Sequence, residues 1–138
     1  MTTFTDSVQL EGGEQRITAA GAAFYMPFSF DPTSSTQVLL GYLPPGAKVV
    51  DVIGGGGSTG GTNPTVDIGT AGDDDGFANE LLSDLVRSGL AGSKMGAQWN
   101  TVISSVAATP VYGKVGASAA TGGTTTGYIV YTVIKTWS

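Results

Sequence analysis

The sequence predicts an all-β protein whose strands form an antiparallel sandwich or barrel, preceded by an extended N-terminal arm. The 138 residues include 22 glycines, together with many threonines and valines, a composition that suits short strands and tight turns better than helices. Hydrophobic residues make up 41% of the chain, enough for a core. Turn signals separate short apolar segments at roughly ten to fifteen residues per strand and turn, which is typical of antiparallel folds.

Residues 1–13 form the predicted arm, and residues 14–138 form a single predicted domain. Phe4, Val8 and Leu10 fall on one parity, a weak strand alternation that ends at a glycine pair. One interpretation is a frayed chain end. The alternative is an extended arm that pairs with a neighbouring subunit, with these three apolar side chains at the interface.

The body of the chain reads as short strands divided by glycine-, proline- and serine-rich turns. We expect strands at residues 15–19, 23–28, 36–43, 48–53, 65–68, 80–86, 98–104, 109–116 and 127–137. The last strand is apolar on both parities as far as Ile134, so we expect it to lie centrally in a sheet and to be covered on both faces. Residues 79–92 also fit a short helix, and both interpretations stay open there.

Charge and composition exclude several classes of function. The six Lys and Arg residues stand singly among eleven Asp and Glu, for a net charge of −5, so neither nucleic acid nor an anionic membrane is an expected partner. The N-terminus lacks the basic and apolar regions of a signal peptide. The chain has no histidine and no cysteine, which removes the commonest catalytic bases, nucleophiles and metal ligands. We therefore expect no enzyme activity, no catalytic residues and no cofactor.

A glycine-rich loop gives the strongest apparent binding motif. Gly55, Gly57 and Gly60 satisfy G-x-G-x-x-G after an expected strand. A phosphate site also needs a following helix whose N-terminus faces the anion, and here the chain runs on into another expected strand. We interpret the loop as a connection or hairpin tip.

Acidic residues offer weaker candidates for chemistry. Asp73, Asp74 and Asp75 resemble the start of a calcium loop, but the later ligand positions are apolar, so we expect a solvated turn and assign no metal ligands. A weak cation site between subunits is the alternative interpretation of these residues. Asp51 and Asp67 each interrupt an apolar strand, and we expect both to point to a solvated outer face.

Two further groups of residues can be weighed for function. The neighbouring Ser93 and Lys94 could form a nucleophile and base, but adjacent loop residues rarely point to one place. Most aromatic residues must lie in the core of so small a domain. Trp99 and Trp137 stand in polar surroundings and are predicted at subunit contacts, where tryptophan is enriched.

The segment from Leu43 to Leu82 resembles small structural proteins encoded beside the major capsid gene of tailed bacteriophages. The shared features are Leu43-Pro-x-Gly46, an apolar strand with one acidic residue, a glycine- and threonine-rich loop, and Asp67-x-Gly-Thr before an acidic Asp-Gly turn. The closing strand YIVYTVI is also similar to theirs. The resemblance implies a capsid cement, or decoration, protein with a jelly-roll sandwich, for which there is no catalytic motif to carry over.

From this resemblance we expect a structural virion protein, made in the host cytoplasm, that binds the capsid exterior and stabilises contacts between major capsid protein subunits. Its expected partners are the major capsid protein and further copies of itself, as a homodimer or homotrimer. An alternative is a phage tail, fibre or baseplate component. A carbohydrate-binding β-sandwich module is a third possibility and would need exposed aromatic side chains in a row.

Overall fold

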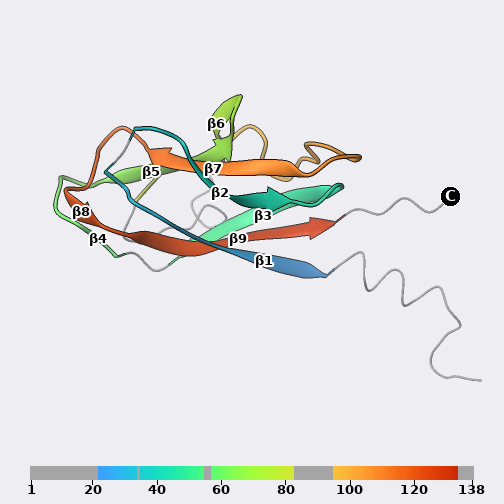
Figure 1. The fold of residues 1–138 in the computed structure, drawn as a ribbon, viewed down its shortest axis with the longest axis horizontal. Helices are drawn as coiled ribbons and strands as arrows, with labels where there is room; N and C mark the ends of the chain where they lie inside the picture. Colours follow the sequence, from blue (N-terminus) through green and yellow to red (C-terminus); the bar gives the residue numbers. More distant parts are fainter. Residues whose placement is uncertain (1–21, 34, 55–56, 83–94, 134–138) are drawn as a thin grey trace, which may run out of the picture.

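The computed structural model describes residues 22–33, 35–54, 57–82 and 95–133, and these form an all-β structure (Figure 1). The predicted arm at residues 1–13 and the predicted strand at residues 15–19 lie outside the described residues. The strands are β1 (Ala23–Phe30), β2 (Val38–Leu43), β3 (Ala47–Gly54), β4 (Ser58–Thr59), β5 (Thr65–Thr70), β6 (Asp73–Leu82), β7 (Thr109–Val115), β8 (Gly122–Gly123) and β9 (Thr125–Val133).

One sheet has three antiparallel strands in the order β1-β9-β3. The register between β1 and β9 runs without a shift from Ala23 opposite Thr132 to Phe30 opposite Thr125. β3 contains a bulge at Val50, which makes both Val49 and Val52 point into the core. The last strand is therefore central in its sheet, as its apolar sequence predicted.

The second sheet has four antiparallel strands in the order β2-β7-β5-β6. β5 and β6 form a hairpin in which Thr70 lies opposite Asp73, so the turn consists of Ala71 and Gly72. The prediction of a turn at residues 73–76 is therefore wrong, because these residues are the first part of β6. The strand expected at residues 80–86 begins earlier, and residues 83–86 lie outside the described part.

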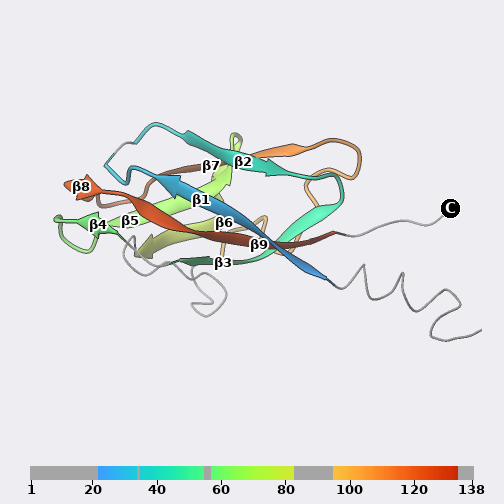
Figure 2. The same ribbon diagram turned by 60° about the horizontal axis from the view of Figure 1, so that its bottom comes forward.

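The two sheets pack face to face in the manner of a β-sandwich (Figure 2). Their buried apolar side chains lie between them. Alternation along β7 is regular, since every second side chain from Thr109 to Val115 is buried. Twelve buried hydrophobic residues form one cluster between the sheets: Phe28, Phe30, Leu43, Ala47, Val49, Val52, Val66, Ile68, Phe77, Ala78, Val111 and Ile129. The all-β class and the antiparallel packing predicted from the sequence are confirmed.

The two lateral edges of the sandwich differ in how they are covered. On one side β3 lies beside β6, and the segment 95–104 runs across both strands. Gln98 N–H donates to the carbonyl of Gly76 in β6, and Asn100 N–H donates to the carbonyl of Val49 in β3. The predicted strand at 98–104 is wrong, because its backbone bonds to two sheets in turn and bends at Asn100, whose φ is +57°.

On the other side, β1 and β2 are the outermost strands of their sheets and lie next to each other. Two large apolar side chains emerge there, Phe24 at 44% exposure and Val38 at 36%. Within the described residues, neither strand has a second hydrogen-bonded neighbour. This open side therefore presents sheet edges of the kind that can accept another chain.

Part of the glycine-rich loop forms a separate two-stranded sheet. β4 pairs with β8 next to Gly57, whose carbonyl accepts the N–H of Thr124. Gly60 and Gly61 have positive φ and lie against Thr121 and Ala119, where a Cβ atom would collide. Among the described residues the loop contains β4 and is followed by β5 and not by a helix, so it connects strands as the sequence predicted.

Candidate functional site

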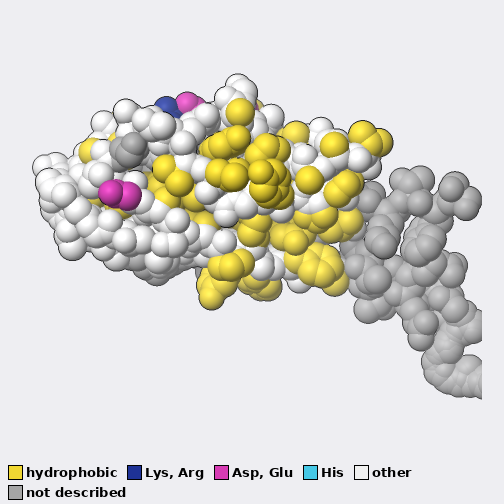
Figure 3. Space-filling view, viewed as in Figure 1, with side chains coloured by type: hydrophobic (Ala, Val, Ile, Leu, Met, Phe, Trp, Pro, Cys, Tyr) yellow, Lys and Arg dark blue, Asp and Glu magenta, His cyan; other side chains and the backbone are white. Residues whose placement is uncertain are grey.

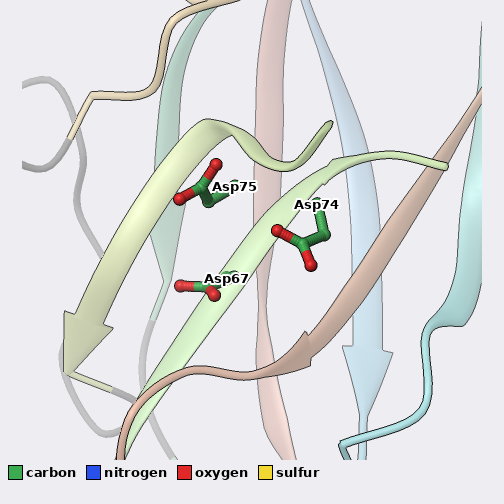
Figure 4. Close-up of side chains that lie close together, drawn as sticks. All are labelled: Asp67, Asp74 and Asp75. Carbon is green, nitrogen blue, oxygen red and sulfur yellow. The ribbon is translucent and has the colours of Figure 1, made fainter. Parts of the chain in front are cut away.

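Three carboxylates converge on the outer side of the four-stranded sheet and form the acidic cluster: Asp67 on β5, and Asp74 and Asp75 on β6 (Figure 4). One oxygen from each lies within 4.8 Å of the others. The hairpin produces this arrangement, because it folds the acidic start of β6 back over the middle of β5.

Asp67 is the most unusual member of the acidic cluster. Its side chain points away from Val66 and Ile68, as predicted, but it is only 6% exposed, so the prediction of a solvated position is wrong. The β6 hairpin covers this part of the sheet, and the N–H of Glu80 donates to Asp67 Oδ1 at 2.9 Å. Burial, opposed in part by that hydrogen bond and reinforced by nearby Glu80 and Asp75, raises the pKa of Asp67 to about 6.

A lysine on the neighbouring strand partly neutralises the cluster. Lys114 Nζ lies 2.8 Å from Asp74 Oδ2, and this hydrogen bond raises the pKa of Lys114. A hydrogen bond between the side chains of Asp73 and Asp75 raises the pKa of Asp73 in turn. Repulsion among these carboxylates is therefore relieved by one ammonium group and by hydrogen bonds.

Glu80 connects the acidic hairpin to the loop that follows β7. It has a φ of +57°, a left-handed conformation that a glutamate rarely adopts. Its Oε1 accepts hydrogen bonds from Thr65 Oγ1 and from the N–H of Ala117, each at 2.9 Å. Its carboxylate thus has an architectural role beside the acidic cluster.

The chemistry open to the acidic cluster is limited. Three carboxylate oxygens are ligands of the type that Ca²⁺ and Mg²⁺ prefer, although Ca²⁺ takes six to eight oxygens and Lys114 already neutralises part of the charge. A carboxyl with a pKa near 6 can exchange protons near neutrality, but the small exposed surface of Asp67 leaves little access for a substrate. Asp51 cannot assist, because it lies on the other sheet and accepts the N–H of Val52.

The predicted contact residues are distributed unevenly over the described structure. Phe4, Val8, Leu10 and Trp137 lie outside the described residues, and so does the Ser93-Lys94 pair. Trp99 is partly buried, and its indole Nε1 donates to the carbonyl of Val50 at 3.0 Å. That bond attaches the segment 95–104 to the bulge in β3, so the indole has an intramolecular role, and its place at a subunit contact stays a prediction.

Large exposed apolar side chains, which sequence reasoning did not single out, gather on β1, β2 and β9 (Figure 3). They are Phe24, Tyr25, Val38, Leu39, Tyr42 and Tyr128, and Val106 is exposed on a loop. Figure 3 shows hydrophobic side chains over β2 and along the lower margin, where β1 runs. Apolar residues occupy both odd and even positions in the expected strands at 23–28 and 36–43, which places apolar side chains on both faces of each strand, and this was the available signal.

Comparison of the chain with protein-family models, with curated proteins and with solved structures finds no match. Within the described residues there is no helix with the length and apolar character needed to cross a membrane.

Proposed function

We propose that the protein is a structural virion component of jelly-roll type that binds the outside of a phage capsid, stabilises contacts between major capsid protein subunits and acts as a homo-oligomer. The single observation that carries this proposal is the set of large apolar side chains exposed on strands of the β-sandwich. Exposed apolar surface of this extent on a small scaffold is typical of proteins that are covered by a partner.

One part of that exposed apolar surface is well suited to binding a capsid shell. The outer sides of β2 and β7 carry Leu39, Tyr42, Pro110 and Tyr112, which we call the leucine–tyrosine patch. Leu39 and Tyr42 are 46% and 59% exposed. Leu39 lies opposite Tyr112 and Tyr42 opposite Pro110, so the patch is continuous across the two strands.

The expected strength of such a contact agrees with a cement function. Covering one exposed leucine or tyrosine contributes roughly 1.5–3 kcal/mol before ordering costs. A single subunit would therefore attach weakly, and joining two or three subunits can tighten attachment about 10²–10⁴-fold without new contacts. The predicted arm, with Phe4, Val8 and Leu10, would add apolar contacts of the same magnitude.

The alternatives receive less support. A tail, fibre or baseplate component would use the same kind of scaffold, and binding to shells is what distinguishes the two. A carbohydrate-binding module needs a flat row of aromatic rings, whereas Tyr25 and Tyr128 meet edge to face at an interplanar angle of 82°. An enzyme would have to work without histidine or cysteine.

Sedimentation with empty capsids tests the proposal. We expect the purified protein to co-sediment with expanded, undecorated shells in mild salt and to raise the temperature at which the shells break down. A protein that stays in the supernatant and leaves the heat resistance of the shells unchanged would contradict the proposal.

A pair of arginine variants places the contact. Tyr42→Arg puts a charge into the leucine–tyrosine patch, and we expect it to weaken shell binding by about tenfold or more. Ser105→Arg adds the same charge to an exposed loop position, and we expect unchanged binding. Equal binding by both variants would contradict the assignment of the contact to this patch.

A further inference from the structure

The outer face of the β1-β9-β3 sheet carries apolar side chains from all three strands. We call it the tyrosine face, formed by Tyr25 and Pro27 on β1, Ile53 on β3, and Tyr128 and Val130 on β9. Their positions follow from the register: Tyr25 lies opposite Val130, and Tyr128 lies between Pro27 and Ile53. These side chains point away from the core cluster, to which none of them belongs.

Two tyrosines dominate this face. Tyr25 is 59% exposed and Tyr128 is 48% exposed, and their rings meet edge to face with centroids 6.1 Å apart. Val130, opposite Tyr25, is only 7% exposed. The tyrosine rings thus form a preorganised apolar surface with hydroxyl groups available for hydrogen bonds, as in many protein interfaces.

The distribution of charge favours a second copy of this chain as the partner that covers the tyrosine face. The residues that β1, β9 and β3 present on this face include one cation, Lys48, and one anion, Asp51, so the face is neutral in a chain with net charge −5. The opposite outer face carries the acidic cluster. Two copies that meet through their tyrosine faces keep their acidic clusters far apart, whereas contact through the opposite faces would bring six carboxylates together.

The face is better suited to self-association than the free edge of β1. Pro27 stands in the middle of β1 and has no N–H to donate, while β1 keeps an unbroken register with β9. A proline in this position interrupts any continuous ladder on the outer edge of the strand. Face-to-face packing of two sheets does not need those donors.

We propose that a second copy of this chain packs on the tyrosine face, so that two β1-β9-β3 sheets meet about a two-fold axis. This inference rests on the proposed self-associating structural function and assigns it a surface and a symmetry. In such an isologous contact each residue is used twice, and Tyr25 and Tyr128 form the centre.

The size of the face sets the expected affinity. Three strands about 4.8 Å apart and roughly eight residues long at about 3.3 Å each give roughly 350–400 Å² per copy. Both copies together remain below the roughly 1,200 Å² of a stable complex, so we expect a dissociation constant on the order of 10–1,000 μM. Copies held side by side on a shell would reach effective concentrations of about millimolar, enough to populate the contact.

Sedimentation equilibrium of the full chain tests this inference, over a range of about 10 μM to 2 mM that brackets the expected constant. We expect a monomer–dimer equilibrium whose dissociation constant rises at least about tenfold in Tyr25→Arg. Tyr42→Arg is the matched control, because Tyr42 is also a strand tyrosine with 59% exposure but lies on the other sheet. We expect it to dimerise like the parent protein.

Two more variants keep the test decisive if Tyr25→Arg fails to fold, which thermal unfolding would reveal. Tyr128→Arg should weaken the dimer similarly, and Tyr25→Phe should preserve it. A chain that stays monomeric up to about 2 mM would overturn the inference and would favour residues 1–21 of the same chain or a shell subunit as the occupant. A trimer, or a dimer weakened by Tyr42→Arg and not by Tyr25→Arg, would also overturn it.

The shell experiment separates this inference from the proposed function. A protein that dimerises through the tyrosine face but ignores shells contradicts the proposed function alone. A protein that binds shells but whose oligomeric state does not respond to Tyr25→Arg or Tyr128→Arg contradicts this inference alone.

Discussion

At the scale of single residues, Asp67 shows how a surface-type sequence pattern can produce a buried charge. Strand alternation places it on the outer face, away from Val66 and Ile68. The β6 hairpin then covers that face and leaves the carboxyl 6% exposed, with one backbone hydrogen bond from Glu80. The ionised form is consequently less stable in the folded protein than in the unfolded chain.

Replacing Asp67 with Asn should stabilise the protein at neutral pH. The amide oxygen can still accept the N–H of Glu80, and the unfavourable burial of a charge is removed. The pKa of Asp67 rises from 3.8 to about 6 on folding, so the folded state binds more protons between these values. Relative to Asp67→Asn, the parent protein should therefore be less stable by about 2–3 kcal/mol above pH 6.

That stability difference should shrink as the pH falls from 6 towards 4 and should vanish below about pH 3, where Asp67 is protonated in both states. Urea unfolding of both proteins at a series of pH values measures it. Asp51→Asn is a suitable control, because Asp51 lies on the other sheet, away from the acidic cluster. A stability difference that is independent of pH would contradict the explanation.

At the scale of elements, the sequence predicts most strands correctly. It fails where hydrogen bonds to distant segments determine the secondary structure. The strands over residues 23–28, 36–43, 48–53, 65–68 and 109–116 are confirmed, because alternation and turn residues encode them locally. The composition of the acidic start of β6 predicts a turn, since the pairing of this segment with β5 is not visible in its own sequence. Two-residue ladders such as that of β4 with β8 join segments far apart in the chain, so the local sequence does not predict them.

The candidate site was predictable only in part. The sequence marks Asp74 and Asp75 as part of one candidate and Asp67 as part of another, but their convergence depends on the two-residue turn at Ala71 and Gly72. The exposed tyrosines could be seen as aromatic residues on strands, yet which face they occupy depends on the register with β9. Pairing register was the missing information in both cases.

The segment 95–104 closes one side of the sandwich, and Trp99 attaches it to β3. Trp99→Phe keeps the aromatic ring but removes the donor to the carbonyl of Val50, which we expect to lower the free energy of unfolding by about 1 kcal/mol. Thermal or urea unfolding measures the change. A free energy of unfolding in Trp99→Phe equal to that of the parent protein would show that this hydrogen bond contributes little to stability.

At the scale of the whole molecule, the connectivity brings the beginning and the end of the described chain together. β9 lies between β1 and β3, so β1 pairs with residues about a hundred positions later: Ala23 lies opposite Thr132. Both sheets share one apolar cluster, in which Phe77 and Ile129 come from different sheets. Neither sheet can therefore bury its inner face without the other.

This connectivity predicts slow, cooperative folding. Contacts between distant strands require large loops to close first, and small all-β proteins of this kind fold in roughly milliseconds to seconds. We expect stopped-flow refolding, followed by tryptophan fluorescence, to lie in that range, and equilibrium unfolding to show one transition by fluorescence and by circular dichroism. Refolding in microseconds, or separate transitions for the two probes, would contradict this expectation.

The position of β9 also has a consequence for synthesis on the ribosome. Tyr128 and Val130, two of the five residues of the tyrosine face, belong to β9, which is translated after all the other described strands. A nascent or prematurely terminated chain that lacks this strand has no complete β1-β9-β3 sheet and cannot display the tyrosine face. On the proposed dimer contact, chains that end before β9 would therefore be excluded from self-association by the order in which the strands are made.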